Sequence, residues 1–186
     1  MPKAVFGLGN PGLAYSLTRH NVGFEVIDLY RKVHRIRRKG RIESSALVYS
    51  VGELLLVKPM TYMNESGQAV RAVLDRHRVE LADALVVYDD LDLPLGRVKI
   101  LPSGGPGSHK GMQSVLRSVE TESLPRLRIG IETADRDATG RDYVLDRFTK
   151  DEWATVTLAL QRAVEAIDVF CDLGIDAAMT RFNRWE

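Results

Sequence analysis

Hydrophobic and polar positions along the chain follow two periods in turn. Short runs rich in apolar and β-branched residues, bounded by glycine, proline or acidic residues, are typical of buried strands. Such runs occur at 3–9, 84–90, 96–102 and 126–131, and the stretch 45–59 holds two runs joined at Val51 and Gly52. Apolar residues at helical spacing predict helices at 21–33, 64–78 and 150–174, and a glycine-rich loop leads into a further helix within 103–119.

Strands and helices therefore alternate, which favours an α/β fold with helices flanking a mostly parallel sheet. The two neighbouring runs in 45–59 are expected to form an antiparallel hairpin, so that the sheet is mixed. Gly174 is expected to end the last long helix. A chain of 186 residues usually forms one domain. We predict a single domain over 1–186 with a twisted, mixed and mostly parallel sheet flanked by helices.

Composition excludes several classes of protein. Hydrophobic residues make up 45% and charged residues 27% of the chain, as in ordinary globular proteins. The single cysteine, Cys171, excludes an internal disulfide framework and suits a reducing compartment. It falls within an apolar helical pattern and is expected to be a core residue rather than a nucleophile. No apolar run reaches the length of a membrane span and no signal peptide precedes the first strand. We expect a cytoplasmic protein with no membrane contact.

The net charge of +1 says little, but the charges are unevenly distributed. Residues 31–41 (RKVHRIRRKGR) contain seven Lys or Arg, one His and no acidic residue. Such a run is suited to contacts with phosphates. It is equally typical of a solvated helix end and loop, and the sequence leaves both interpretations open.

The GLGNPG motif at 7–12 has the G-x-G-x-x-G spacing of a dinucleotide-binding loop. In that fold a helix begins at the glycines, so that its N-terminal amides meet the pyrophosphate. Here the helical pattern begins only near Asn21. The acidic residue that should end a second strand is replaced by Glu25 and Asp28, which lie inside the first helix. A nucleotide-binding protein is therefore disfavoured, because it needs a helix that starts at Gly9.

Unusual loops follow several of the predicted strands, where ligands collect in open α/β sheets. These loops supply one imidazole (His20), three carboxamides (Asn10, Asn21, Asn64), three carboxylates (Asp89, Asp90, Asp92) and many glycine amides. A His–Asp pair can activate water, because the carboxylate fixes the imidazole tautomer and stabilises the imidazolium. No G-x-S-x-G motif is present to suggest a serine enzyme. The residues thus indicate a hydrolase of the general-base type.

Each of these residues also has a structural interpretation. His20 could stabilise its loop, and the three acids could cap the turn before residues 94–96. The acids could also bind Mg²⁺, although the further oxygen ligands of such a site are not identifiable. His34 and His77 are expected to be solvated, and His109, at a predicted helix start, is expected to hold its loop.

Five stretches together resemble the bacterial peptidyl-tRNA hydrolase family. They are GLGNPG, TRHNVGF, KPMTYMNESG, DDLDLPLG and GGPGSHKGMQSV, followed by RLRIGI, and they occur in the order and spacing of the family over nearly the whole chain. The resemblance implies an enzyme that cleaves the ester between a peptide and the 3′ ribose of tRNA. It further implies a cytoplasmic, monomeric protein that recycles tRNA from abandoned translation and needs no metal or cofactor.

The resemblance also implies a role for each residue that matches a family motif. His20 is the expected general base and Asp89 its orienting partner. Asn10 is expected to tell a blocked from a free amino group, and Asn64 to bind the substrate near the scissile ester. Tyr15 and Tyr62 are expected to line the same cleft.

The sequence departs from the family pattern in two places. Residues 108–111 read Ser-His-Lys-Gly where the family usually has Gly-His-Asn-Gly. Lysine only donates hydrogen bonds, so Lys110 is expected either to contact a tRNA phosphate or to stabilise negative charge on the ester oxygen. The stretch GIETADRD at 130–137 stands where members commonly run Gly-Ile-Gly-x-Pro.

The expected partner is tRNA, held mainly by salt-sensitive electrostatic contacts. Candidate phosphate contacts are Lys99, Lys110 and Arg128, with Arg37, Arg38 and Lys39 as weaker candidates. The competing hypothesis is a relative that binds tRNA or another RNA without catalysis. The joint presence of the four motif residues His20, Asp89, Asn10 and Asn64 argues against it, whereas Lys110 is the one feature in its favour.

Overall fold

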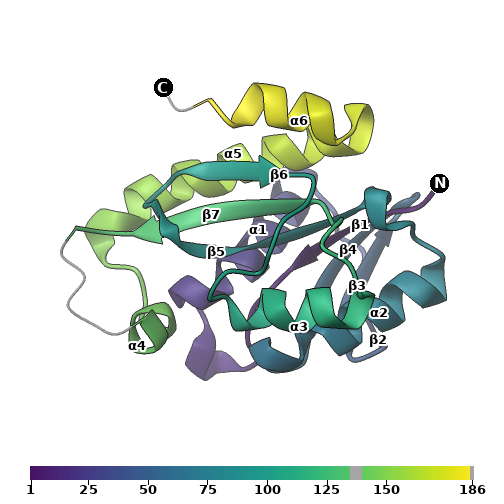
Figure 1. Cartoon of the computed structure of the whole chain (residues 1–186), viewed down its shortest axis with the longest axis horizontal. Coiled ribbons are helices and arrows are strands. Elements are labelled where there is room, and N and C mark those ends of the chain that lie inside the picture. The colour runs from purple at the N-terminus through teal and green to yellow at the C-terminus, as the bar shows by residue number, and fades with distance from the viewer. Residues whose placement is uncertain (135–139, 185–186) are drawn as a thin grey trace.

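A seven-stranded mixed sheet runs through the middle of the molecule in the computed structural model, which describes residues 1–134 and 140–184 (Figure 1). The strands are β1 (Lys3–Gly7), β2 (Arg41–Glu43), β3 (Ala46–Val51), β4 (Leu54–Pro59), β5 (Ala84–Pro94), β6 (Val98–Leu101) and β7 (Arg126–Glu132). They are ordered β2-β3-β4-β1-β5-β7-β6 across the sheet. The pairs β1–β4, β1–β5 and β5–β7 are parallel, and antiparallel pairs complete both edges.

Helices cover both faces of this sheet. They are α1 (Val22–Val33), α2 (Ser66–His77), α3 (Lys110–Val119), α4 (Gly140–Leu145), α5 (Lys150–Leu173) and α6 (Ile175–Phe182). Helices α1, α5 and α6 lie on one face, and α2 and α3 lie on the other (Figure 1). No described helix has both the length and the apolar character that crossing a membrane requires.

Side chains on the central strands feed two separate hydrophobic cores. On β1, Val5 packs into the core beneath α1 and α5, whereas Ala4 and Phe6 pack into the core beneath α2 and α3. Successive side chains of a strand point to opposite faces. Because both faces are covered, these strands read as continuous apolar runs rather than as alternating ones.

The strand order also determines where a site can form. The parallel strands β1, β4, β5 and β7 point in one direction, so their carboxyl ends lie at the same edge of the sheet. Strand β1 has β4 on one side and β5 on the other, so the chain leaves β1 toward the β4 side of the sheet and later crosses back past β1 to reach β5. Crevices at such switch points are the usual ligand sites of open α/β sheets.

The architecture confirms the predicted fold class and the elements expected from periodicity. The hairpin of β3 and β4, the long α5, and its end at Gly174, whose φ is 86°, are all present. Three elements were not foreseen, namely β2, α4 and α6. The stretch after Asp90 was expected to be a loop, which is wrong, because β5 continues to Pro94 through an irregularity in its pairing with β7.

The glycines of 7–12 serve packing and turning rather than nucleotide binding. No helix begins at Gly9, since a single 3₁₀ turn occupies Leu13–Tyr15 and α1 begins at Val22. A Cβ on Gly9 would lie 2.7 Å from the ring of Phe24, so a side chain there would push α1 off the sheet. Gly12 has a φ of 102°, which favours glycine. The expectation against a dinucleotide loop is confirmed.

Candidate active site

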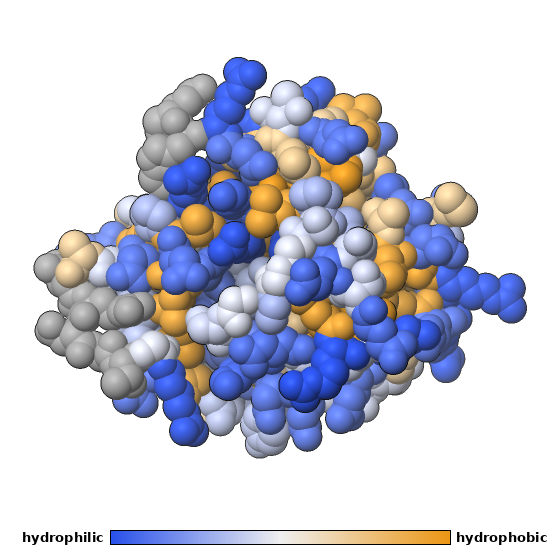
Figure 2. Space-filling view, in the orientation of Figure 1, coloured by the Kyte–Doolittle hydropathy of each residue, from blue (hydrophilic) through white to orange (hydrophobic). Residues whose placement is uncertain are grey.

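A cleft of about 1010 Å³ opens at the carboxyl ends of the parallel strands. Its lining comes from the loops after β1 and β4, from strands β5 and β7, from the glycine-rich loop before α3, and from α4. Most of the sequence-predicted site residues line it: Asn10, Tyr15, His20, Tyr62, Asn64, Asp89, Lys110 and Arg128. Hydrophilic residues predominate on the face of the molecule that Figure 2 shows, with smaller apolar patches between them.

His20 and Asp89 form a buried pair within this cleft. His20 lies in the 3₁₀ turn η2 (Arg19–Asn21) just before α1, and its Nδ1 is 2.9 and 3.0 Å from the two carboxylate oxygens of Asp89. The exposed fractions are 8% for His20 and 1% for Asp89. Because an ionised carboxylate only accepts, Nδ1 carries the proton and donates it to Asp89. The other ring nitrogen, Nε2, then carries a lone pair, which has no hydrogen-bond partner among the described residues.

A second imidazole contacts the same carboxylate. His109, the N-cap of α3, has its Nε2 2.9 Å from Oδ1 of Asp89. Its Nδ1 accepts from the backbone N–H of Met112 at 3.1 Å, so the ring proton must sit on Nε2 and point at Asp89. Sequence reasoning assigned His109 only to its loop. A histidine directly before a helix and after a glycine-rich loop was the available signal, but its contact with Asp89 depends on tertiary structure.

This arrangement shifts two pKa values. Burial alone would raise the pKa of Asp89, but the attraction and hydrogen bonds of His20 and His109 outweigh it and hold that pKa well below its usual range. Burial alone would lower the pKa of His20, but the Asp89 carboxylate outweighs burial and raises it. The carboxylate is therefore ionised at neutral pH, and the His20 imidazole is a stronger base than an ordinary one.

The same three side chains are the one group of at least three His, Cys, Asp or Glu in the described part of the chain with a metal-like spacing, since their ligand atoms lie within 4.8 Å of one another. The hydrogen bonds do not fit a metal. The Met112 amide keeps the proton on Nε2 of His109, which is the nitrogen that would have to bind the ion. Asp90 does not supply a free ligand either, because it accepts from the Asp92 amide and pairs with Arg128. The Mg²⁺ interpretation of these acids therefore gains no support.

Three hydrogen bonds hold Asn10 in place. Its backbone N–H donates to Oδ1 of Asn21 at 2.8 Å, and its backbone carbonyl accepts from Nδ2 of Asn21 at 2.9 Å. Its own Oδ1 accepts from the N–H of Met63 at 2.7 Å. The Asn21 amide is thus used to hold the loop and is not part of a substrate site. Among the described residues, Nδ2 of Asn10 has no hydrogen-bond partner, so Asn10 offers the cleft a donor.

The remaining motif residues form the rim of the cleft. The rings of Tyr15 and Tyr62 meet edge to face with centroids 6.4 Å apart, and Tyr62 is 57% exposed. Asn64 is exposed in the 3₁₀ turn η3 (Met63–Glu65), which directly precedes α2. Lys110, the first residue of α3, is exposed and lines the cleft beside His109. The structure therefore brings all four to one opening.

Two basic residues expected to meet phosphates occupy neighbouring strands. Lys99 on β6 and Arg128 on β7 are directly opposite in the antiparallel pair, so their side chains share a face of the sheet. Arg128 lines the cleft and forms an ion pair with Asp90, whereas Lys99 is outside the cleft lining. The stretch 130–137 that departs from the family pattern is only partly described, since 135–139 lie outside the described residues.

The basic run at 31–41 lies away from the cleft. It covers the end of α1, the connection after it and the start of β2, which is the edge strand farthest from β6. Its Arg37, Arg38 and Lys39 side chains are exposed and do not line the cleft. This placement fits the solvated helix end and loop better than a contact with the substrate end of tRNA.

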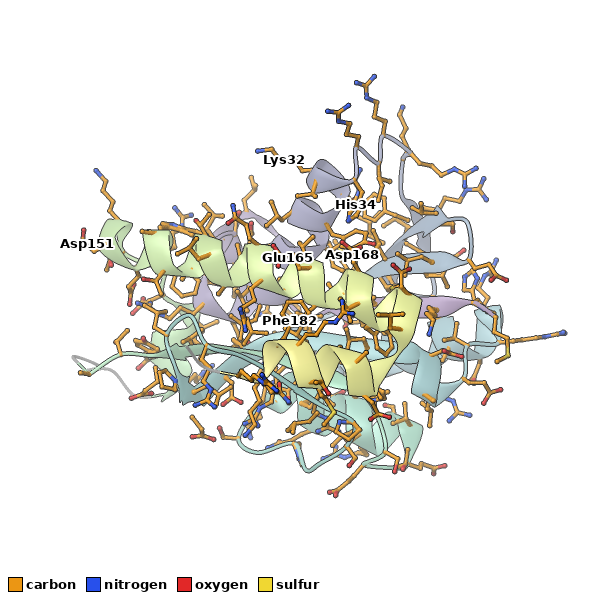
Figure 3. All side chains as sticks on the ribbon, turned by 90° about the horizontal axis from the view of Figure 1, so that it is seen from above. Lys32, His34, Asp151, Glu165, Asp168 and Phe182 are labelled. Atoms are coloured by element: carbon orange, nitrogen blue, oxygen red, sulfur yellow. The ribbon has the colours of Figure 1, made fainter. Side chains whose placement is uncertain are left out.

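Three other residues were expected to lie outside the site, and they do. His34 was expected to be solvated, but its Nε2 is 3.2 Å from Oδ2 of Asp168, which joins the end of α1 to α5 (Figure 3). His77 likewise contacts Glu43 of β2 at 2.5 Å. His34 is exposed as expected and His77 is only partly exposed, and each ring also lies against an acid of a neighbouring element. Burial raises the pKa of the Cys171 thiol to about 12, so it is no nucleophile.

Comparisons of the sequence and of the structure with known proteins find similarity to the same family. The sequence profile of the family described as Peptidyl-tRNA hydrolase matches residues 4–186. The peptidyl-tRNA hydrolase of Syntrophomonas wolfei is 44% identical over 184 residues, covering 97% of this chain and 100% of that protein. That of a Sulfurihydrogenibium species is 41% identical over 186 residues, covering 99% and 98%. The crystal structure of the Acinetobacter baumannii enzyme superposes with a TM-score of 0.89 at 26% identity, covering 100% of this chain and 96% of that one.

Proposed function

This chain belongs to the peptidyl-tRNA hydrolase family, and we propose how the residues of its cleft carry out the family's reaction. It is an enzyme that hydrolyses peptidyl-tRNA, splitting the ester between the peptide and the 3′ ribose of tRNA. The roles of the individual side chains are the proposal. The observation that carries it is the His20–Asp89 pair, whose hydrogen bond leaves Nε2 of His20 free within the cleft.

In the proposed reaction, Nε2 of His20 accepts a proton from a water molecule while the water oxygen attacks the ester carbonyl carbon. The imidazolium formed is stabilised by Asp89, whose two oxygens already face Nδ1. When the tetrahedral intermediate collapses, the bond to the 3′ oxygen breaks and the imidazolium returns its proton to that oxygen. The products are a tRNA with a free 3′ hydroxyl and a peptide with a free carboxylic acid, which loses its proton to the solvent.

His109 is proposed to keep this pair in one tautomer. Its Nε2–H occupies one lone pair of Oδ1 of Asp89, and its Nδ1 is committed to the Met112 amide. Asp89 therefore accepts a hydrogen bond from each of the two rings, and it cannot rotate without losing one of these bonds. The carboxylate stays aligned with His20 through the catalytic cycle.

Asn10 is proposed to distinguish a peptidyl group from a free amino acid. Because its Oδ1 is taken by the Met63 amide, Asn10 presents only the N–H groups of Nδ2 to a substrate. A peptide carbonyl can accept from that donor. A free aminoacyl-tRNA presents an ammonium, which has no acceptor to offer and would face a donor in a mostly buried position.

The other substrate contacts follow from position on the rim. Asn64 is proposed to bind the substrate amide near the ester, and the edge-to-face pair of Tyr15 and Tyr62 to pack against the chain of the peptide. Lys110 lies one residue after His109 at the N-terminal end of α3. It is proposed to contact either a tRNA phosphate or the oxygen on which negative charge develops.

The tRNA is proposed to lie across the face that carries Lys99, Arg128 and Lys110. Arg128 already pairs with Asp90, so its contribution to phosphate binding requires that this ion pair be shared or exchanged. Arg37, Arg38 and Lys39, at the far edge of the sheet, are weaker candidates. We also propose that the protein acts as a monomer in the cytoplasm, where peptidyl-tRNA arises, without a metal or cofactor.

The test is the release of an N-blocked amino acid from its tRNA by the wild type and by His20→Ala. The proposal expects a fall of roughly 10²–10⁴-fold in kcat, the usual contribution of general-base catalysis. Equal rates would contradict it. If neither protein releases the amino acid although both bind tRNA, the chain is a non-catalytic RNA-binding relative instead.

A further inference from the structure

Arg19, the residue before His20, is almost completely buried, with 5% of its surface exposed. One guanidinium nitrogen, Nη2, donates to both carboxylate oxygens of Glu152, at 2.9 and 2.8 Å. The other, Nη1, donates to the backbone carbonyl of Arg147 at 3.0 Å. The guanidinium carbon also lies 4.1 Å from the ring centroid of Tyr143. One side chain thus contacts three positions of the segment after β7.

The backbone repeats the same connection. The N–H of Arg19 donates to the carbonyl of Asp146 at 3.0 Å, and Thr18 forms an isolated antiparallel bridge with Arg147. The turn that carries His20 is therefore attached to 143–147 by main-chain and side-chain contacts together. These segments are more than 120 residues apart in the chain.

The attached segment is one wall of the cleft. Helix α4 contributes Gly140, Arg141, Val144 and Leu145 to the lining, and the contacts of Arg19 fall at the end of this helix and just after it. Tyr143 is in turn fixed to β7, because its hydroxyl donates to the carbonyl of Ile131 at 2.5 Å. The position of this wall relative to His20 thus depends on Arg19.

The acceptor of Arg19 is itself oriented. Glu152 lies in the first turn of α5, where it accepts from the Thr149 amide at 2.6 Å and its own amide donates to the Thr149 hydroxyl at 3.2 Å. This capping box holds the carboxylate toward Arg19. The planar guanidinium of arginine can donate to a carboxylate and to carbonyls while it stacks on an aromatic ring. The ammonium group of lysine cannot do this.

We propose that Arg19 is a positioning residue for the reaction: it locks the turn that carries His20 to the α4 wall of the cleft, so that the general base and the bound substrate keep a fixed geometry. The inference rests on the proposed role of His20. It assigns Arg19 no contact with the substrate or the reacting atoms.

The chain provides a matched control for a purely stabilising arginine. Arg162 on α5 donates through Nη2 to the carbonyls of Phe182 and Arg184, at 3.3 and 3.1 Å, and its guanidinium lies 5.4 Å from the ring of Phe182. It joins α5 to α6, where Figure 3 shows Phe182 beside α5, and it does not line the cleft. Arg162, like Arg19, donates to backbone carbonyls and lies over an aromatic ring, but it is far from the turn that carries His20.

The experiment compares Arg19→Lys with Arg162→Lys in kcat, KM and thermal unfolding. Arg19→Lys is expected to lower kcat by about 10–100-fold, because small displacements of a catalytic group are costly. The KM and the pH midpoint of kcat should change little, since the cleft lining and the His20–Asp89 pair remain. Arg162→Lys is expected to lower the melting temperature while kcat stays near the wild-type value. An unchanged kcat in folded Arg19→Lys would overturn the proposal.

A second variant keeps the proposal testable if Arg19→Lys does not fold. Glu152→Gln retains the size of the side chain and one oxygen, and it should lower kcat in the same way but by less. Where both variants fold, the double variant should lose less than the product of the two single effects, because the two groups act as a pair. Fully independent effects would contradict the pairing. If His20→Ala keeps wild-type activity, the proposed function fails instead, whatever Arg19 does.

Discussion

Asp89→Asn tests how the two histidines share one carboxylate. In the wild type, Asp89 accepts one hydrogen bond from the His20 ring and another from the His109 ring. A carboxamide at this position has one oxygen and one NH₂ group, so only one of the two sites that Oδ1 and Oδ2 now occupy can still accept. His109 contacts Oδ1 alone, whereas His20 contacts both oxygens. His109 has no freedom to adapt, because the Met112 amide keeps its Nδ1 as an acceptor. The carboxamide oxygen must therefore serve His109.

The consequence falls on His20. The NH₂ group then takes the place of Oδ2, which lies 3.0 Å from Nδ1 of His20. Two N–H donors repel at this distance, so we expect Nδ1 to accept from the NH₂ group and the ring proton to move to Nε2. That nitrogen is the one proposed to take the proton from water, and it would already be protonated. The general base is lost although His20 is still present, and we expect kcat to fall by between about 10² and 10⁴-fold, or about 2.7–5.4 kcal/mol. A comparable change of tautomer in the Ser-His-Asp triad costs about 10⁴-fold.

The assay is the steady-state release of an N-blocked amino acid from tRNA, together with ¹⁵N NMR of the imidazoles to locate the ring protons. The critical variant is the double change Asp89→Asn with His109→Asn. An asparagine at the N-cap of α3 still accepts from the Met112 amide, but it does not reach position 89. The carboxamide at 89 could then turn its oxygen to His20 and restore the original tautomer.

We therefore predict that a second mutation in the cleft restores activity. The double variant should exceed Asp89→Asn by at least about tenfold, which corresponds to about 1.4 kcal/mol. The single variant His109→Asn is the control, and it should lose less activity than Asp89→Asn. A double variant no more active than Asp89→Asn would refute the tautomer argument, as would an Nδ1-protonated His20 in the Asp89→Asn spectrum.

Three further predictions concern pH, the lysine of α3 and selectivity. The base must be neutral to act, so kcat/KM should rise with pH through the raised pKa of His20, with a midpoint above that of an ordinary imidazole; a pH–rate profile with a lower midpoint would contradict the assignment. Lys110→Asn should keep at least about a tenth of the activity, since general-base catalysis by His20 is untouched; near-complete loss with intact folding would make Lys110 catalytic. Asn10→Asp keeps an acceptor for the Met63 amide but adds a charge that attracts ammonium. The preference for N-blocked over free aminoacyl-tRNA should then shrink by about tenfold or more, the value of one charged hydrogen bond, as measured by the ratio of the two kcat/KM values.

Elements with a strong local signal were predictable from the sequence. The apolar run of β1, the apolar stripe of α1 and the length of α5 each lie within one segment, so neighbouring residues carry the pattern. Strand β2 has no such signal, because its three residues lie at the end of a basic run and become a strand only by pairing with β3. Helix α6 is short and follows directly after Gly174, so its packing on α5 and β6 was not visible in the sequence.

The candidate site, too, could be predicted from the sequence only in part. The site residues His20, Asp89, Asn10 and Asn64 could be named because glycine-rich and polar stretches follow the predicted strands, and because those stretches resemble one family. Their shared location follows from the strand order, which places the carboxyl ends of β1, β4 and β5 together. Asn21 was assigned to the same set of amides, yet it holds the backbone of Asn10 instead.

The sequence by itself determined which chemical groups this protein has and those helices and strands whose pattern lies within one segment. Only the tertiary structure decided how those groups are protonated and held. The pKa shifts of His20 and Asp89 require burial and a facing charge, and the ring proton of His109 depends on the Met112 amide. The ion pair of Arg19 and Glu152 spans 133 residues. Hydrogen bonds and desolvation act over a few ångströms in space, so they depend on contacts that neighbours in the sequence do not reveal.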